Sequence, residues 1–143
     1  MIEISIDKSK LDIALIHKFI SEESYWGKGI PISTLITAIE NSLCFGVYLN
    51  EKQIGFARVI SDKATFAYLA DVFILNEHQG KGYSKLLIAF IKDHTDLQGL
   101  RRWMLATADA HSLYEKYGFK VLSKPERLME IVISNIYEKN PDR

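Results

Sequence analysis

Residues 72–87 read VFILNEHQGKGYSKLL, a single stretch with an apolar run, a polar segment containing two glycines, and a second apolar pattern. The first run predicts a buried strand, and the apolar positions after residue 82 recur at helical spacing. Backbone N–H groups at the start of a helix carry partial positive charge, and glycines let a ligand approach the backbone closely. The stretch therefore favours a loop that holds a phosphate or pyrophosphate. The alternative is a plain strand-to-helix turn in which glycine serves only the backbone geometry.

The glycine loop differs from two common phosphate-binding motifs. It has neither the Gly-Lys-Ser/Thr ending of a Walker A loop nor the third glycine of a dinucleotide-binding loop. Lys81 and Lys85 would add positive charge beside it. The chain could also be a small protein that binds a nucleotide phosphate, but the absence of both motifs argues against that function.

Outward from this stretch, hydrophobic periodicity predicts strands and helices along the whole chain. Three consecutive strands, at 44–49, 53–61 and 65–75, are expected to form an antiparallel meander. The unit 65–106 is expected to be a right-handed parallel crossover. The other predicted elements are a strand at 2–6, helices at 9–22, 33–43, 83–91 and 109–118, strands at 102–106, 119–122 and 128–134, and a polar tail at 138–143 that frays.

The predicted order is β-α-α-β-β-β-α-β-α-β-β. Such an order favours an α/β fold with a mixed sheet and helices on its faces. A chain of 143 residues matches the usual size of one domain, and it contains no stretch rich in Pro, Gly and Ser that would serve as a linker. We therefore expect residues 1–143 to form a single domain.

Composition excludes several classes of protein. The 18 Lys+Arg balance the 18 Asp+Glu, whereas proteins that bind duplex nucleic acid usually carry a basic excess, so no nucleic-acid partner is expected. No apolar run is long enough for a membrane span, and the first residues lack the apolar core of a secretory signal. Cys44 is the single cysteine, which rules out an intrachain disulfide and a Cys-rich zinc site. We expect a cytoplasmic protein with no membrane partner and no metal.

A second motif follows at residues 107–119, which read TADAHSLYEKYGF. The Gln-x-x-Gly-x-Gly/Ala pattern, here Gln79 to Ser84, together with Ala-x-x-Leu-Tyr-x-x-x-Gly-Phe, here Ala110 to Phe119, resembles the GNAT superfamily of acyl-CoA-dependent N-acyltransferases. The two motifs cover about a third of the chain and stand in the family's order. The resemblance implies a GNAT-like fold and an N-acetyltransferase that moves an acetyl group from acetyl-CoA directly to a primary amine in a ternary complex.

The resemblance also implies roles for individual residues. In the family, the strand before the glycine loop pairs with the pantetheine arm, the loop amides hold the pyrophosphate, and a tyrosine near the sulfur protonates the departing thiolate. That tyrosine is Tyr114 here. Two positions depart from the pattern: Ser84 replaces the usual Gly or Ala, and Thr107 replaces an Asn that contacts the pantetheine amide. The implied cofactor-binding residues are Val72, Phe73, Ile74, Gln79, Gly80, Lys81, Gly82, Tyr83, Ser84 and Thr107.

The chemistry itself calls for a base, because an alkylammonium with a pKa near about 10 must lose a proton before it attacks a thioester. Asp71 immediately precedes the pantetheine strand, and an acidic residue on this strand is often the base in related enzymes. The alternative for Asp71 is a structural pair with Arg58. His111 and water are the other candidates for the base. Cys44, among apolar neighbours, is expected to be a buried structural thiol.

The acceptor site is expected between the first two helices, where the family often covers its acceptor with a loop. Tyr25 and Trp26 in this loop, and Arg58 on an apolar strand face, are the candidate contacts to a small-molecule or peptide amine. The sequence does not fix the oligomeric state; because dimers are common in the family, the resemblance also suggests a homodimer. The competing function is a CoA-binding sensor or interaction module without turnover, against which the phenol of Tyr114 argues.

Overall fold

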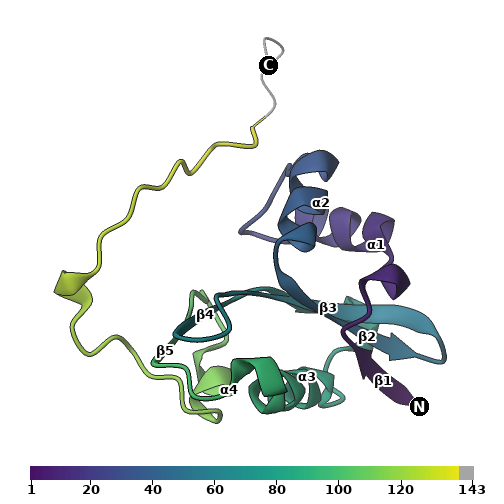
Figure 1. The fold of residues 1–143 in the computed structure, drawn as a ribbon. Helices are drawn as coiled ribbons and strands as arrows, with labels where there is room; N and C mark the ends of the chain where they lie inside the picture. Colours follow the sequence, from purple (N-terminus) through teal and green to yellow (C-terminus); the bar gives the residue numbers. More distant parts are fainter. Residues whose placement is uncertain (139–143) are drawn as a thin grey trace.

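The computed structural model describes residues 1–138 and contains a five-stranded mixed sheet with helices on both faces (Figure 1). The sheet order is β1-β2-β3-β4-β5; β1 to β4 are antiparallel, and β5 runs parallel to β4. The predicted α/β fold, the meander and the parallel pairing of the two strands of the 65–106 unit are thereby confirmed. The strands are β1 (Ile2–Ser5), β2 (Leu43–Leu49), β3 (Lys52–Ser61), β4 (Phe66–Ile74) and β5 (Arg102–Leu105).

The helices divide between the two faces of the sheet. In Figure 1, α1 (Ile13–Lys18) and α2 (Ile32–Glu40) lie on one face, and α3 (Tyr83–Asp93) and α4 (His111–Glu115) lie on the other. Helix α1 begins where the Asp12 carboxylate accepts a hydrogen bond from the Leu15 amide, and it continues as a π-helical turn, Phe19–Glu23. Within residues 1–138, no helix is both long and apolar enough to cross a membrane.

Two buried clusters, one on each face, fix the sheet between these helices. The side chains of successive strand residues point to opposite faces, so Phe56 of β3 packs with α1 and α2 whereas its neighbour Ala57 packs with α3. Helix α3 contributes Leu87, Ile88 and Ile91 at helical spacing, all almost fully buried. This packing holds β4 and α3 in place on either side of the glycine loop.

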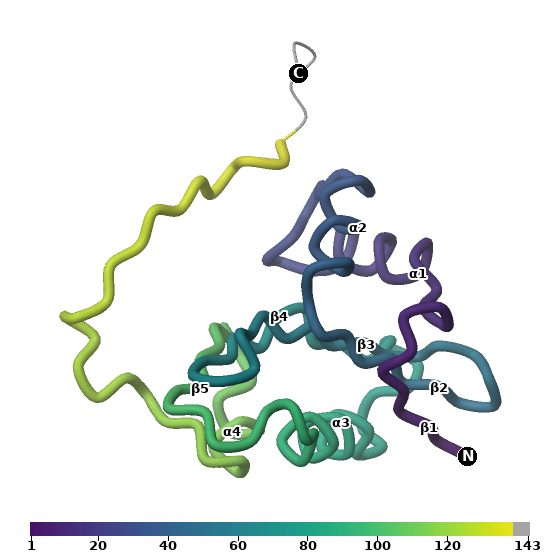
Figure 2. Tube along the Cα trace, viewed as in Figure 1, coloured from purple at the N-terminus to yellow at the C-terminus, as the bar shows by residue number. Residues whose placement is uncertain are grey.

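The predicted closing strands at 119–122 and 128–134 are wrong, because no strand follows β5 within residues 1–138. Residues 119–136, which we call the C-terminal arm, run away from the sheet in an extended course (Figures 1 and 2). Apolar and β-branched residues favour an extended backbone, but a strand also needs a hydrogen-bonded neighbour, and within residues 1–138 no strand pairs with 119–122 or 128–134. The predicted fraying tail lies outside the described residues from residue 139 onward.

Candidate active site

The site forms where β4 and β5 part. The two strands pair only from Phe66 and Arg102 to Leu69 and Leu105, yet β4 continues to Ile74. Beyond Leu69, the edge of β4 that faces β5 has no strand beside it within the described residues. A cleft of about 1080 Å³ opens at this point, lined by β4, the glycine loop, the start of α3 and the segment after β5.

A bulge in β4 explains why the strands separate. Phe56 of β3 lies opposite Phe73, and Arg58 lies opposite Ala70, so one residue of β3 faces two residues of β4. Within this bulge, Asp71 has a φ of 54°, in the left-handed region. Asp adopts this region more readily than most residues do, and a bulge bends its strand. The sequence thus turns β4 away from β5 at the position where the cleft begins.

The glycine loop presents unpaired backbone N–H groups to this cleft. Gly80 and Gly82 have φ values of 78° and 82°, and a Cβ at either position would have nothing within 4 Å. No side chain caps α3 at Gly82, and within residues 1–138 no acceptor is recorded for the amides of residues 80–84. The Gln79 side chain donates to the Ile74 carbonyl at 2.9 Å, which fixes the loop to the end of β4. The loop is therefore a preformed site for an anion.

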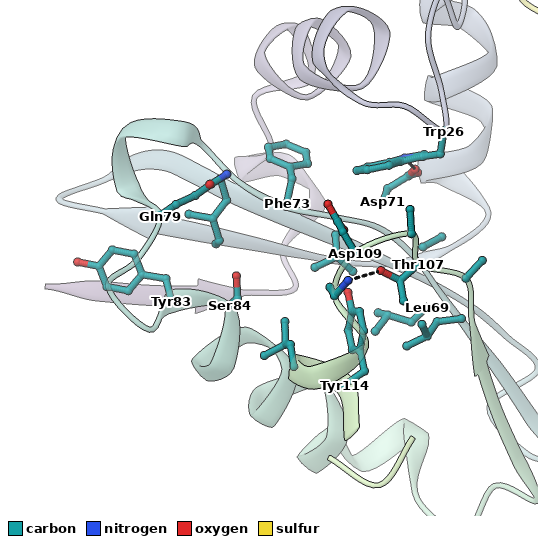
Figure 3. Close-up of a pocket in the computed structure, with 18 of the residues that line it drawn as sticks. Trp26, Leu69, Asp71, Phe73, Gln79, Tyr83, Ser84, Thr107, Asp109 and Tyr114 are labelled. Carbon is teal, nitrogen blue, oxygen red and sulfur yellow. Dashed lines mark hydrogen bonds between the residues drawn. The ribbon is translucent and has the colours of Figure 1, made fainter. Parts of the chain in front are cut away.

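Tyr114 of α4 is buried at the wall of the cleft, where its ring packs edge-on against Phe119 with centroids 5.9 Å apart. Burial, with smaller contributions from Tyr25 and Asp109, raises the pKa of the phenol to about 12. The phenol therefore keeps its proton at neutral pH. Figure 3 shows Tyr114 between the loop residues Tyr83 and Ser84 on one side and Asp71 with Trp26 on the other.

Asp71 is held by donors from two other elements. Its Oδ1 accepts a hydrogen bond of 2.7 Å from Trp26 Nε1, and its Oδ2 accepts one of 2.8 Å from Arg58 Nε. Arg58 also donates to Ser42 Oγ at 3.1 Å. The ion pair of Asp71 with Arg58, which the sequence raised as the structural alternative, is therefore present. The catalytic role of Asp71 stays a prediction.

The loop between α1 and α2 reaches across the cleft through its two aromatic residues. The Tyr25 hydroxyl accepts a hydrogen bond of 2.9 Å from the Ala108 amide, while Trp26 bonds to Asp71. The two rings pack edge-on with centroids 5.1 Å apart. Thr107 Oγ1 accepts from the Ala110 amide at 3.0 Å, so its hydroxyl hydrogen remains available for another partner (Figure 3).

The cleft brings together nearly all the residues that the sequence singled out. Lys81 is exposed and does not line it, and His111 does not line it either. The sequence did not indicate the Ala108 amide or the bond of Asn76 to Glu23, because these partners are far apart along the chain. The predicted residues that line the cleft are Tyr25, Trp26, Arg58, Asp71, Val72, Phe73, Ile74, Gln79, Gly80, Gly82, Tyr83, Ser84, Thr107 and Tyr114.

Comparison with known proteins identifies the family to which this geometry belongs. The family model described as an acetyltransferase (GNAT) domain matches residues 40–121, more than half of the chain. The chain belongs to the GNAT acetyltransferase family. A Gibberella zeae protein assigned as an acetyltransferase, FG08082, is 33% identical over 135 residues, which cover 79% of this chain and 75% of that protein.

Solved structures agree with the GNAT assignment. A protein assigned to the GNAT family from Xanthomonas campestris pv. campestris has a crystal structure that is 51% identical, with a TM-score of 0.95 over 97% of this chain and 98% of that one. A predicted acetyltransferase from Clostridium acetobutylicum, solved with acetyl-CoA, is 13% identical, with a TM-score of 0.68 over 92% of this chain and 96% of its own, which shows the fold.

The residues of the GNAT cleft fit acetyl-CoA. The free amides at 80–84 suit a pyrophosphate, and the open edge of β4 offers backbone groups to the amides of a pantetheine arm. The glycines leave the loop unobstructed, since a Cβ at Gly80 or Gly82 would meet nothing within 4 Å. Across residues 1–138, no group of three or more His, Cys, Asp or Glu side chains is placed to hold a metal.

Proposed function

We propose that this GNAT protein transfers the acetyl group of acetyl-CoA directly to a primary amine while both substrates are bound. One observation carries the proposal: the open edge of β4 connects the amide-lined loop to a buried, protonated phenol within a single cleft. A sensor that only bound CoA would have no use for a phenol at this position. Residues 1–143 are taken as one acetyltransferase domain in the cytoplasm.

The cofactor end of the cleft is assigned to backbone groups. The loop Gln79, Gly80, Lys81, Gly82, Tyr83 and Ser84 would hold the pyrophosphate, and Val72, Phe73 and Ile74 would hold the pantetheine arm. The Thr107 hydroxyl has a free hydrogen to donate in place of the Asn amide common in the family. When bound, acetyl-CoA supplies an acetyl thioester as the acyl donor.

At the reacting end, Asp71 would accept the proton that the amine loses, and Tyr114 would donate the proton that the departing thiolate takes. Among residues 1–138, each Asp71 oxygen accepts one hydrogen bond, which leaves lone pairs that can orient an ammonium group and accept its proton. Amides on the open edge of β4 can stabilise developing negative charge. The Tyr114 phenol keeps the proton that a departing thiolate can take. His111 and water remain the other candidates for the base.

Direct transfer is favoured over a covalent acyl-enzyme. Cys44 is the single cysteine, and it is buried outside the cleft, where desolvation raises its pKa to about 11. A thiol in that state is a poor nucleophile. Ser84 lines the cleft, but within the described residues no hydrogen bond joins its hydroxyl to an imidazole or carboxylate that would activate it.

The acceptor end favours a cationic amine from a small molecule or a peptide. Glu23, Asp71 and Asp109 line the cleft; of the cations that line it, Arg58 is already paired with Asp71 and Lys85 belongs to α3 next to the glycine loop. The Trp26 side chain bonds to Asp71 and packs against Tyr25, and aromatic rings of this kind are suited to contact an alkylammonium group.

The test is a thiol-release assay with acetyl-CoA and a panel of primary amines, combined with mass spectrometry of the products. The panel comprises polyamines, amino acids, amino sugars and short peptides, and N,N-dimethylated versions of the same amines serve as matched controls that cannot form a stable amide. We expect thiol release with at least one primary amine and none with its dimethylated control. Binding of CoA without release for any amine would support the sensor instead, and failure to bind CoA would remove the cofactor assignment as well.

A further inference from the structure

The carboxylate of Glu23 lines the cleft but has no part in the proposed transfer, which uses only Asp71 and Tyr114. Its Oε1 accepts a hydrogen bond of 3.0 Å from Asn76 Nδ2. Within residues 1–138, no salt bridge joins Glu23 to a cation. A charged group at a partly desolvated site is stabilised by a partner of opposite charge. The Glu23 carboxylate is therefore available to a cation that enters the cleft.

The chain around Glu23 holds this carboxylate in a fixed place. Glu23 is the last residue of the π-helical turn Phe19–Glu23, a rare geometry that occurs frequently at functional sites. The next residue, Ser24, is buried, and its hydroxyl donates to the Ile20 carbonyl at 2.6 Å and accepts from the Gly27 amide at 3.0 Å. The backbone on the far side of the turn is thereby fixed, so Glu23 projects from a rigid element.

An apolar wall lies between Glu23 and Asp71. The rings of Phe19 and Phe73 stack with centroids 4.0 Å apart, and both residues line the cleft. Phe73 follows Asp71 on β4, with its ring turned to the same side of the strand (Figure 3). Asn76, which holds Glu23, comes five positions after Asp71, so at most about 18 Å of chain separates them. The cleft thus presents two carboxylates with aromatic surface between them.

We propose that Glu23 determines the acceptor, a linear aliphatic diamine or polyamine whose reacting nitrogen lies at Asp71 while a second ammonium group pairs with Glu23. This acceptor class rests on the proposed acetyl transfer and narrows it. The methylene chain would lie on the Phe19 and Phe73 rings, where apolar contact stabilises it. A monoamine would leave Glu23 unpaired, and an α-amino acid would add a negative charge to a cleft that already holds the carboxylates of Glu23, Asp71 and Asp109.

Only one nitrogen of a diamine reacts. Its ammonium form gives one proton to Asp71, which releases it to water. The neutral nitrogen then bonds to the acetyl carbonyl carbon, the C–S bond breaks, the thiolate takes the phenolic proton of Tyr114, and the second proton lost by nitrogen restores the phenol. The distal nitrogen keeps its proton. The product has a single ammonium group, so it cannot react at Asp71 and pair with Glu23 together, and the monoacetyl diamine should accumulate.

The first experiment measures kcat/KM with acetyl-CoA for linear α,ω-diamines of increasing length, each beside the n-alkylamine with the same number of carbon atoms. The best diamine should exceed its monoamine at least about tenfold through a lower KM, the effect of one hydrogen bond to a charged group. The preference should rise to an optimum length and then fall, because the two carboxylates are fixed. Mass spectrometry should show the monoacetyl product.

The second experiment compares two variants on the same π-helical turn. Glu23→Gln keeps an oxygen for the Asn76 amide but loses the charge, and it should lower the diamine-to-monoamine ratio of kcat/KM by about tenfold. The matched control is Glu22→Gln, an exposed neighbour that does not line the cleft, and it should keep the wild-type ratio. Calorimetry of the best diamine on protein saturated with CoA should show the same loss of affinity in Glu23→Gln alone.

Three results would overturn the role of Glu23. Diamines that are no better than monoamines at every length would exclude a second ammonium site. A preference that survives in Glu23→Gln would assign that site to another carboxylate, such as Asp109. Amino acids acetylated faster than diamines would exclude the acceptor class. If no amine is acetylated, the proposed function fails, and the calorimetry alone then decides whether a diamine binds through Glu23.

Discussion

The two ends of the cleft are built in different ways. The loop proposed to hold the pyrophosphate is a continuous piece of sequence, residues 79–84, and residues 80–84 present backbone N–H groups that lack acceptors within the described part of the chain. The acceptor end is assembled from side chains far apart in sequence: Trp26 meets Asp71 across 45 positions, and Tyr25 meets Ala108 across 83.

This difference determines how each end responds to substitution. A site made of amides depends on the backbone shape and is insensitive to most side-chain changes, whereas a site made of side-chain pairs depends on every partner. Changes at the loop should therefore affect CoA binding, and changes near Asp71 should affect the amine. The predictions below test this separation, beginning with the largest expected effect.

Gly82→Asp should weaken CoA binding at least about 100-fold. A non-glycine residue at φ 82° is strained by about 1–3 kcal/mol, and the carboxylate would oppose the phosphates. Calorimetry with CoA measures the change. The matched control is Gly99→Asp, another glycine with positive φ and nothing within 4 Å of a Cβ, outside the cleft. Equal affinity in the folded Gly82 and Gly99 variants would remove the loop from the site.

Asp71→Asn should lower kcat/KM for the amine by about 30-fold near neutral pH, just below the usual range of about 10²–10⁴-fold for a general base. Asn tolerates the left-handed φ of this position, so the bulge should persist. The deficit should shrink as pH approaches the pKa of the amine, about 10, because free amine needs no base.

The control for this variant is Asp109→Asn, which removes another carboxylate of the cleft and leaves the contacts to Trp26 and Arg58 intact. It should show a smaller deficit with no dependence on pH. A constant deficit of Asp71→Asn across the pH range would limit Asp71 to positioning the acceptor loop, and a change in CoA affinity would contradict the separation of the two ends.

Tyr114→Phe should reduce kcat by about tenfold, below the usual range of about 10²–10⁴-fold for a general acid, because a thiolate already leaves readily. KM for acetyl-CoA should hold, since the ring is retained. With a pKa of about 12, the phenol stays protonated to about pH 11, so the wild-type rate should show no alkaline loss from this group up to pH 10. The control is Tyr117→Phe, which removes a hydroxyl that donates to the Lys85 carbonyl, because Tyr117 itself does not line the cleft. A raised KM with normal kcat would make Tyr114 a binding residue.

The smallest effect concerns stability at alkaline pH. Desolvation raises the pKa of Cys44 from 9.0 to about 11 in the folded chain. The unfolded chain therefore loses the thiol proton first, so stability is complete below pH 9 and falls as pH rises toward 11. Melting temperatures should drop by a few degrees over this window, and more gently in Cys44→Ala, which removes the titrating group. Parallel curves for the two proteins would show that other groups account for the loss.

The sequence predicted the parts of the molecule that local patterns encode. Strand, glycine loop and helix are consecutive in 72–87, and the structure places them as β4, the loop and α3. The bulge at Asp71 left no local signal, because it depends on how β3 aligns with β4. The same limit explains the error over the arm: residues 128–134 are rich in the apolar and β-branched residues typical of strands, but pairing depends on a partner that composition does not specify.

The acceptor contacts were only partly predictable. Tyr25 and Trp26 were singled out because large amphipathic side chains suit contact with a ligand, and Arg58 because a charged residue on an apolar strand face needs a partner. The structure gives each of them a hydrogen bond within the chain. Sequence could not identify which partner, since a hydrogen bond between residues 25 and 108 follows from the packing of the α1–α2 loop over the end of the sheet.

The single bond from the Ala108 amide to the Tyr25 hydroxyl has a kinetic consequence. It is exposed to water, where a hydrogen bond contributes a net of only about 0.5–1.5 kcal/mol. Taken alone, a hydrogen bond of that strength is broken for about a tenth to a third of the time. Loops of this size move within nanoseconds to microseconds. Movement of the Tyr25 side chain should therefore not limit the rate at which an amine binds. The rate of turnover should be set by chemistry or product release instead.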